Sequence, residues 1–262
     1  MMLTDELGRT LALRNTPQRL ISLVPSLTEY LFYLGLGQRV VGVTDYCIAP
    51  AAGVATLPKV RGTKNPDCAA ISALQPDLVL MNKEENRERD VLALAEAGLS
   101  VYVTDITTVA GARATLARLA ELLDCRAQAA GLLAEIDAEL ALAPPPSVRY
   151  AAAIWRDPWM FVGSATYADD LLAHCGGRNI AATWEGRYPR AELAKLAAQQ
   201  PNLLLLPDEP YRFSAADLPA VAGVAPRIAL CDGMALTWYG PRTHQALRTF
   251  RQLLAASIAR PI

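Results

Sequence analysis

Aromatic and charged residues gather in a few short segments of this 262-residue chain. All four tryptophans lie in residues 155–160, 184–188 and 238–240, although aromatic residues make up only 6% of the sequence. The first two segments also contain arginine together with aspartate or glutamate. Flat rings supply area for stacking and charged groups fix orientation, so this mixture predicts a site for a large, partly planar and polar ligand.

Catalytic motifs are absent from the sequence. The two histidines, His174 and His244, lie far apart, and there is no nucleophile elbow, phosphate-binding loop or dinucleotide-binding glycine motif. We therefore predict no catalytic residues, no catalytic cofactor and no metal-ligating residues. The alternative is an enzyme that acts on a polar small molecule, with Glu84, Asp157 or Glu209 as its acid or base.

Composition narrows the class of protein. The chain is 52% hydrophobic and 19% charged, so a sizeable core is expected, and its net charge of −1 argues against nucleic acid as a partner. No apolar run approaches the roughly 18 residues that span a membrane. The five cysteines are scattered without a CxxC, which argues against a disulfide framework or a zinc cluster. Residues 1–6 show no signal-peptide pattern, which favours the cytoplasm.

The first part of the chain alternates short apolar strands with helices. A hairpin is expected over residues 3–13, and strands are expected at 19–24, 40–44, 76–81 and 100–104. Such alternation predicts a parallel α/β sheet. Two further predictions are local: Ser26 or Thr28 caps a helix over residues 29–36, and residues 58–67 form a loop.

A proline-free stretch over residues 107–142 organises the middle of the chain. Its apolar residues recur at helical spacing, and a single helix of this length would measure about 50 Å. The pattern favours two helices that meet near Asp124 and Cys125, with the second running to Ala143. Strands at 149–155, 201–206 and 227–231 then follow, with helices at 167–174, 191–198 and 243–258.

The two halves of the sequence match each other. Residues 75–80 (QPDLVL) correspond to 200–205 (QPNLLL), and Arg19 at the start of one strand corresponds to Arg149. Residues 100–105 likewise correspond to 227–232, in the same order along the chain. The matches predict two copies of one architecture.

Ligands of open parallel sheets bind outside the carboxyl ends of the strands. We therefore take candidate ligand-binding residues from the segments that follow each strand in both halves. The candidates are Ser26, Tyr46, Lys64, Asn65, Lys83, Glu84, Trp155, Arg156, Trp159, Trp184, Arg187, Tyr188, Glu209, Tyr211, Trp238 and Tyr239.

These features resemble the substrate-binding proteins of ABC importers that take up vitamin B12, haem and ferric siderophores, the group with a helical backbone. The resemblance rests on residues 19–29 (RLISLVPSLTE), on 40–44 (VVGVT), on the paired Gln-Pro-Asp/Asn strands and on the long helical stretch. It implies two Rossmann-like α/β lobes with mostly parallel sheets, a long rigid helix joining them and a ligand cleft between them. The expected domains are 1–107, a helical segment 108–143, and 144–262.

The resemblance also implies a function and a partner. The expected activity is non-enzymatic binding of a corrinoid, haem or ferric siderophore, in a periplasmic protein or a cytosolic relative. A cytosolic sensor or chaperone for a metal cofactor is a further alternative. Importer-docking members carry a glutamate on each lobe, but the corresponding positions here are Ala69 and Ala194, with Asp67 and Glu192 two residues away. The expected partner is the small-molecule metal complex. The resemblance implies an ABC permease as a second partner, and the two alanines argue against it.

Overall fold

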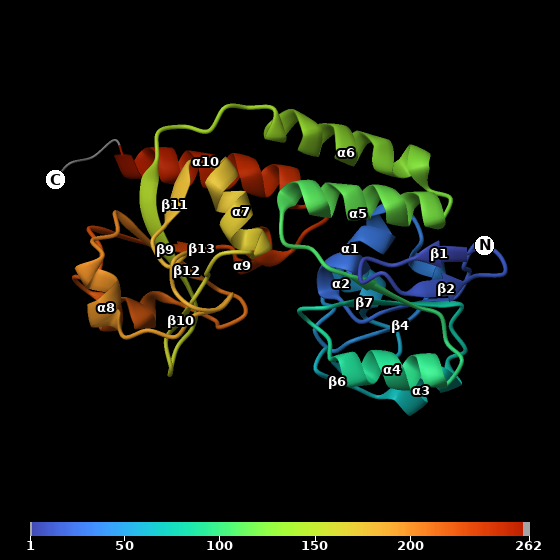
Figure 1. Cartoon of the computed structure of the whole chain (residues 1–262). Helices are drawn as coiled ribbons and strands as arrows, with labels where there is room; N and C mark the ends of the chain where they lie inside the picture. Colours follow the sequence, from blue (N-terminus) through green and yellow to red (C-terminus); the bar gives the residue numbers. More distant parts are fainter. Residues whose placement is uncertain (1, 259–262) are drawn as a thin grey trace. The chain divides into compact units, whose positions relative to one another are not determined.

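The computed structural model describes residues 2–258, and the outermost residues of the expected domains lie outside this range. The chain divides into two compact units (Figure 1). The first comprises the residues up to Ile106 together with Ala112–Leu133, and the second comprises Thr107–Gly111 and the residues from Ala134 onward. The division therefore falls inside two helices, α5 (Val109–Leu122) and α6 (Arg126–Leu140).

The sheet of the first unit is parallel throughout. Its strands are β3 (Leu20–Ser22), β4 (Val40–Val43), β7 (Leu78–Asn82) and β8 (Val101–Thr104), in the order β4-β3-β7-β8. An antiparallel hairpin of β1 (Met2–Thr4) and β2 (Thr10–Ala12) precedes them, as the sequence predicts. The predicted α/β class with mostly parallel sheets is confirmed.

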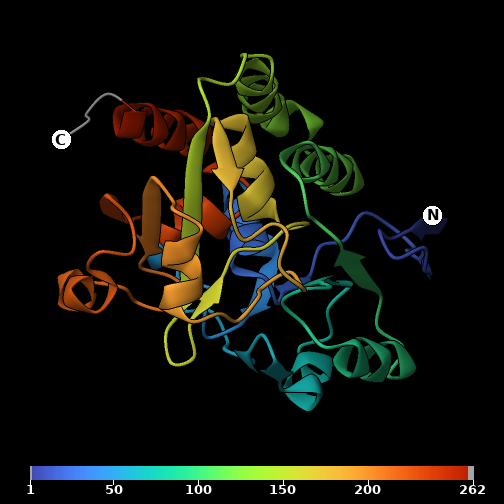
Figure 2. The same ribbon diagram turned by 60° about the vertical axis from the view of Figure 1, so that its left-hand side comes forward.

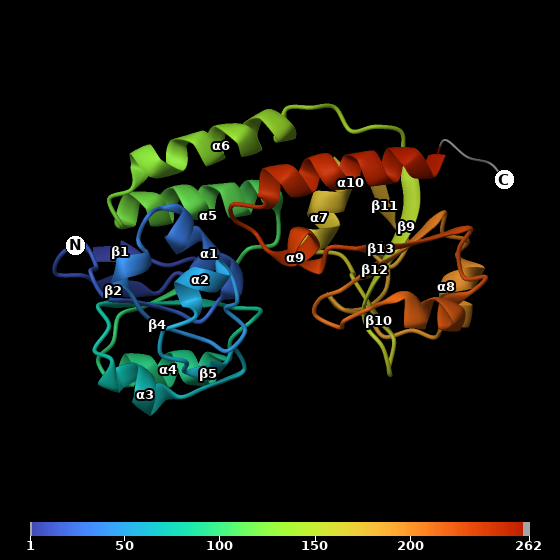
Figure 3. The ribbon, with the colours of Figure 1, turned by 180° about the vertical axis from the view of Figure 1, so that it is seen from behind.

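Helices cover both faces of this sheet, which is why β7 and β8 are buried along their whole length. On one face, Val79 and Met81 pack with Ile71 of α3 (Cys68–Ala73) and Leu94 of α4 (Glu88–Glu96). On the other lie α1 (Pro25–Tyr33) and α5 (Val109–Leu122), where the Tyr30 hydroxyl donates to the Leu116 carbonyl at 2.8 Å (Figure 3). The sheet and its helices thus form three layers.

The predicted start of α1 was wrong by four residues. The helix begins at Pro25, directly after the β3 segment, with Val24 as its N-cap. Proline fits the first helical position because its φ is already helical and the amide it lacks would have no intrahelical partner. Ser26 and Thr28 therefore lie inside the first turn, where the Thr28 hydroxyl donates to the Val24 carbonyl rather than capping.

The predicted loop over residues 58–67 contains a small hairpin instead. Strands β5 (Arg61–Gly62) and β6 (Asn65–Pro66) pair antiparallel. Short elements η1 (Gly37–Arg39) and α2 (Ala51–Val54) complete this unit. The predicted pair of helices is confirmed: α5 ends at Leu122, α6 begins at Arg126, and Asp124 between them has a left-handed φ of 59°.

The second unit repeats the strand order of the first. Its parallel strands β9 (Val148–Trp155), β11 (Gly177–Asn179), β12 (Leu203–Pro207) and β13 (Arg227–Cys231) lie in the order β11-β9-β12-β13 (Figure 2). An added strand, β10 (Met160–Phe161), pairs antiparallel with the end of β9. The sequence did not predict β10 or β11.

Two sets of helices cover the second sheet. Alternate residues Ala151, Ala153 and Leu204 pack with Leu196 of α8 (Leu193–Ala198) and Val221 of η2 (Ala215–Val221). The opposite face meets α7 (Tyr167–His174) and α10 (Thr243–Ile258), which also contacts α9 (Gly233–Thr237). The early segment Thr107–Gly111 belongs to this unit, and the Val109 amide donates to Asp170 Oδ2 at 2.7 Å.

A cluster of ion pairs fixes α6 to α10. The buried carboxylate of Glu139 accepts from Arg248 Nε and Arg251 Nη1, each at 2.6 Å. Arg248 also pairs with Glu135, whose side chain is 50% exposed. Burial would raise the pKa of Glu139, but the two arginines outweigh it and the pKa lies below its ordinary value.

The duplication extends to individual hydrogen bonds. Arg19 donates to the carbonyls of Gln75 and Leu74, and Arg149 donates to those of Gln200 and Gln199. The Asp77 carboxylate accepts from the Arg19 amide, and the Asn202 side chain accepts from the Arg149 amide. The matched sequence segments therefore build the same turn in both units.

This turn carries backbone strain that a substitution can remove. Gln75 and Gln200 precede proline with φ values of 47° and 50°, in the left-handed region that disfavours side chains, and both are exposed. We expect Gln75→Gly and Gln200→Gly each to stabilise the protein by about 0.5 kcal/mol, measured by urea unfolding. The matched control Gln199→Gly, at a residue with right-handed helical φ and ψ, should destabilise the protein by about as much. Destabilisation by Gln75→Gly or Gln200→Gly, with stabilisation by Gln199→Gly, would contradict the expectation.

Candidate functional site

The carboxyl ends of β9, β12 and β13 meet at one edge of the second sheet because the three strands are parallel. Trp155 ends β9, Asp208 and Glu209 follow β12, and Asp232 follows β13. Two of the residues that the sequence selected, Trp155 and Glu209, are thereby brought to one edge, where ligands of parallel sheets bind.

Six aromatic rings form a continuous chain of contacts at this edge, which we call the aromatic cluster. Ring centroids lie 5.7 Å apart between Trp155 and Tyr211, 4.6 Å between Tyr211 and Phe213, and 5.8 Å between Phe213 and Trp159. Phe161 then joins Trp159 at 6.5 Å and Trp184 at 5.8 Å. The cluster comprises Trp155, Trp159, Phe161, Trp184, Tyr211 and Phe213.

The rings differ in how much surface they leave for a ligand. Phe161 and Phe213 are buried, and Trp159, Trp184 and Tyr211 pack against the hydrophobic core of the unit. Trp155 is 42% exposed and stands on this support through its edge contact with Tyr211. Trp155 is therefore the ring of the cluster best placed to stack on a ligand, and the others hold it.

Arg156 is held within the unit by a partner. Its Nη1 donates to Asp217 Oδ1 at 2.6 Å, and its guanidinium lies 5.9 Å from the centroid of Trp159. The hydrogen bond from Arg156 lowers the pKa of Asp217, so the carboxylate stays ionised and balances the arginine. The sequence did not single out Asp217, Phe161 or Phe213, and only the density of aromatic residues over 155–161 and 211–213 hinted at the last two.

Glu209 lies in a confined position after β12. Trp238 Nε1 donates to its Oε1 at 3.3 Å, and a side chain at Gly233 would come within 2.5 Å of the Glu209 backbone. Burial raises the pKa of the Glu209 carboxyl, and the nearby acids Asp208 and Asp232 add to that effect. Trp238 and Tyr239 are themselves buried at 5% exposure, so they support this region from beneath.

A pocket of about 460 Å³ lies beside the cluster at the ends of β12 and β13. Its walls are partly acidic, with Asp208 and Asp232, and partly apolar or sulfur-containing. The remaining lining residues are Phe213, Leu230, Cys231 and Met234.

The strand ends of the first unit are brought together mainly by asparagine side chains. Asn82, the last residue of β7, accepts from the amides of Glu84 and Glu85. Asn86 donates to the carbonyls of Leu23 and Thr63, which ties the β5–β6 turn to the end of β3. Asn82 and Asn86 are not among the predicted ligand-binding residues, although both lie in the segment that follows the predicted strand at 76–81.

Several selected residues meet on this asparagine frame. Lys64, at the β5–β6 turn, donates to the Glu84 carbonyl. Tyr46 is 61% exposed. Its ring and the Asn65 side chain both lie next to the Cα of Gly62, where a glycine leaves room for them. These four residues come from three segments, after β4, at the β5–β6 hairpin and after β7, and form a polar, partly aromatic rim.

The other selected residues are placed differently. Lys83 pairs with Asp105 at 2.6 Å, and Arg187 and Tyr188 are half-buried after Trp184. Ser26 is buried, and its Oγ has no hydrogen-bond partner in the described part of the chain. Residues 2–258 contain no group of three or more His, Cys, Asp or Glu side chains arranged to hold a metal ion. No helix in that range is long and apolar enough to span a membrane.

The chain resembles known binding proteins in both sequence and fold. It is 26% identical over 192 residues to a vitamin B12-binding protein of Vibrio campbellii, which covers 71% of this chain and 70% of that protein. The periplasmic vitamin B12-binding protein BtuF of Vibrio cholerae matches with a TM-score of 0.80 at 20% identity, over 94% of this chain and 99% of that one. A periplasmic haem-binding protein of Pseudomonas aeruginosa matches with a TM-score of 0.79 at 24% identity, over 94% and 95%.

A family model covers most of the chain as well. The model described as periplasmic binding protein matches residues 20–217, a range that runs from β3 in the first unit through the Asp217 that pairs with Arg156 in the second. The chain therefore belongs to the periplasmic binding protein family, the class of ABC-importer substrate-binding proteins that its sequence resembles.

Proposed function

We propose that this protein binds a corrinoid of the cobalamin type, with Trp155 as its main stacking residue. The aromatic cluster supports the proposal, because its exposed ring, Trp155, contacts Tyr211, which in turn packs on the other rings of the cluster. A planar macrocycle gains most from such a preorganised ring, since little side-chain freedom is lost on binding. Binding without turnover is what members of this family do, so the enzyme alternative with Glu84, Asp157 or Glu209 falls away.

Charge at the strand ends favours a corrinoid over haem. Asp208, Glu209 and Asp232 lie together there, while Arg156 is already paired with Asp217. Haem carries two carboxylates that these acids would repel, whereas the amide side chains of a corrinoid can donate hydrogen bonds to carboxylates. Within the first unit, the rim of Tyr46, Lys64, Asn65 and Glu84 is proposed as a polar surface that can contact a ligand.

Equilibrium dialysis tests the ligand directly. The purified protein is dialysed against cobalamin, cobinamide, haem and a ferric hydroxamate, and retention is read by visible absorption. We expect cobalamin to be retained one-to-one at micromolar affinity or better, about −8 kcal/mol, and haem more weakly. Tighter retention of haem or of the ferric chelate would overturn the corrinoid assignment, and retention of none would favour the cofactor-sensor alternative.

The affinity should depend on pH through Glu209. Because burial raises the pKa of this carboxyl, it becomes protonated at a higher pH than an ordinary glutamate and then loses its acceptor charge. We expect cobalamin affinity to be constant well above that pKa and to fall as pH decreases through it, by about tenfold if one charge-assisted hydrogen bond is lost. Glu209→Gln should flatten the profile, whereas the matched change Asp157→Asn, at an 85% exposed side chain, should leave it unchanged.

A permease partner is proposed to use an acid close to the alanines at the expected docking positions. Ala69 and Ala194 are exposed on α3 and α8. Asp67 caps α3 by accepting from the Ala70 amide, whereas Glu192 at the start of α8 is exposed and makes no capping bond. Glu192→Lys should therefore reduce ligand-stimulated ATP hydrolysis by the cognate transporter more than Asp67→Asn does, and equal effects would contradict this choice.

A further inference from the structure

The last strands of the two sheets, β8 and β13, occupy equivalent positions but have different surroundings. Each pairs on one side with its neighbour, β7 or β12, and has no strand on the other side in the described part of the chain. β8 is buried at every residue. In β13 all five residues are partly or fully exposed, and Leu230 is 44% exposed.

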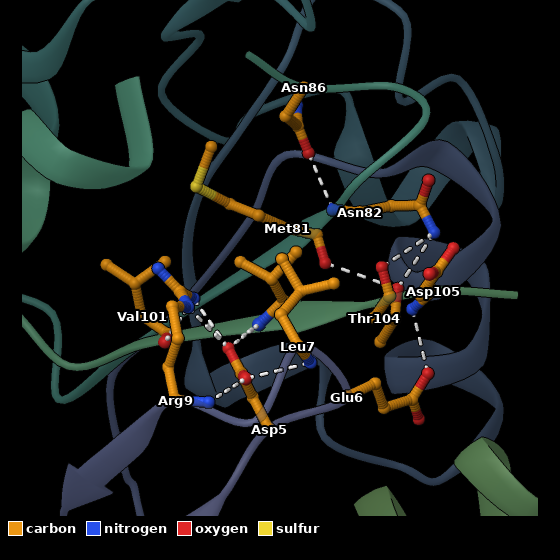
Figure 4. Close-up of polar contacts among 11 residues, drawn as sticks. Asp5, Glu6, Leu7, Arg9, Met81, Asn82, Asn86, Val101, Thr104 and Asp105 are labelled. Carbon is orange, nitrogen blue, oxygen red and sulfur yellow. Dashed lines mark hydrogen bonds and ion pairs between the residues drawn. The ribbon is translucent and has the colours of Figure 1, made fainter. Parts of the chain in front are cut away.

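The chain itself satisfies the open edge of β8. The loop between β1 and β2 reaches it, with the Glu6 amide donating to the Val103 carbonyl at 3.2 Å and the Val103 amide donating to Asp5 Oδ2 at 3.3 Å (Figure 4). The Asp105 amide donates to Glu6 Oε2 at 2.8 Å. An open strand edge of this kind therefore pairs with an extended segment whose hydrogen-bond donors and acceptors match those of the edge.

The corresponding groups of β13 have no such partner. The Cys231 carbonyl accepts from the Asp208 amide, so Cys231 and Ala229 direct their backbone groups toward β12. Alternate residues of a strand point the other way, which directs the amides and carbonyls of Ile228 and Leu230 away from the sheet. No hydrogen bond to these outward groups is found within residues 2–258.

Charge at the two ends of this edge is complementary. Arg227, at the start of β13, is exposed, and its Nη1 donates to the Ala256 carbonyl at 2.7 Å, which leaves other guanidinium donors for a second partner. At the far end lies the pocket with Asp208 and Asp232. Each of these carboxylates uses one oxygen to accept a backbone amide of α9, which leaves the other oxygen for a cation.

We propose that β13 docks edge to edge with β13 of a second copy of this chain, antiparallel, so that Arg227 of the partner subunit reaches the acidic pocket of Asp208 and Asp232. Because the proposed corrinoid would use the same two carboxylates, dimer formation and ligand binding compete. The contact is isologous and closed, so it ends at a dimer.

Symmetry fixes the register of this pairing. A two-fold axis through an antiparallel pair of identical strands places one residue opposite itself, and the outward-facing groups require Ile228 to oppose Leu230 of the partner subunit. Ala229 is then the residue on the axis, where its small side chain permits close approach. Arg227 of the partner subunit lies opposite Cys231, beside the pocket. The register that satisfies the backbone thus also brings together the opposite charges.

The interface is small, so the expected dimer is weak and reversible. Five residues a side bury less than the roughly 1,600 Å² of a standard stable interface. Analytical ultracentrifugation of the full chain from about 5 μM to 1 mM should show a monomer–dimer equilibrium. Hydrogen exchange of the Ile228 and Leu230 amides should slow with rising protein concentration, while exchange of Ala229 stays unchanged. A monomer throughout, or exchange independent of concentration, would overturn the proposal.

Substitutions at the edge test the register. Leu230→Pro removes an outward amide that β12 does not use, so it should abolish the dimer, whereas Leu230→Val keeps the amide and should retain it. Circular dichroism and the midpoint of thermal unfolding show whether the proline variant is folded. If the proline variant is not folded, Arg227→Glu tests the interface instead, because this side chain is exposed. We expect Arg227→Glu to raise the dimer dissociation constant by at least about tenfold. Arg227→Lys keeps the charge and should retain most of the affinity. A dimer dissociation constant that is unchanged by Arg227→Glu, or by a folded Leu230→Pro variant, would refute this interface.

Discussion

Trp155→Ala should weaken cobalamin binding by about 30-fold, equivalent to about 2 kcal/mol, while leaving the free energy of unfolding almost unchanged. The reason is the position of the ring: it is 42% exposed at the end of β9 and contributes little to the core, but it presents the stacking surface of the aromatic cluster. Isothermal titration calorimetry and urea unfolding of the same variant separate the two effects.

Two other aromatic residues serve as controls for this result. Trp184 packs against the core of the second unit, so Trp184→Ala should mainly lower the free energy of unfolding, by about 2 kcal/mol. Tyr33 is similarly exposed, at 46%, but lies at the end of α1, away from the strand ends, and Tyr33→Ala should change neither quantity. An unchanged cobalamin affinity in Trp155→Ala would remove the stacking role of the cluster.

Glu139→Gln should lower the free energy of unfolding by about 2 kcal/mol near neutral pH. The buried carboxylate accepts from two arginines, Arg248 and Arg251. A neutral amide leaves Arg251 without its carboxylate and leaves Arg248 with only the exposed Glu135. Because the folded pKa lies below the ordinary value of 4.5, the carboxylate stabilises the fold above that pH. The stabilisation is lost as pH falls through the lowered folded pKa, so the stability curves of wild type and variant should converge there.

Glu135 provides a matched comparison on the same helix. It pairs with the same Arg248, but its side chain is 50% exposed, and solvent screens the pair. Glu135→Gln should therefore cost less than about 0.5 kcal/mol at any pH. Two results would show that burial of Glu139 is not what makes its ion pairs strong. One is an equal loss of unfolding free energy in Glu139→Gln and Glu135→Gln; the other is that the stability curves of wild type and Glu139→Gln stay parallel as pH falls.

Sequence patterns predicted the fold where one physical requirement dominates. Both copies of the Gln-Pro turn were predicted because proline and the following apolar run leave few other conformations, and the break at Asp124 was predicted by the change of helical register. The start of α1 was mispredicted, since Ser26 is a good cap by propensity but Pro25 already has a helical φ. The strand pairs β5–β6 and β9–β10 join neighbouring segments, but β5, β6 and β10 have only two residues each and leave no periodicity to detect.

The candidate site was predicted in outline only. The strand-end rule correctly located Trp155, Tyr211 and Glu209 at one edge of the second sheet. It could not distinguish exposed rings from supporting ones, since Trp238 and Trp155 look alike in sequence but are 5% and 42% exposed. Nor could it reveal that Arg156 is paired with Asp217, 61 residues away, because that contact depends on how η2 folds back.

The interleaving of the two units along the chain bears on how the protein folds during synthesis. All of the first unit lies in the first 133 residues, so its sheet and its helices can form as soon as that length has left the ribosome. Residues 107–111 emerge earlier than the rest of the second unit, and Val109 must wait for Asp170 before its amide is satisfied. Vectorial synthesis therefore orders the assembly: the amino-terminal unit first, then the second unit built onto a short segment already in place.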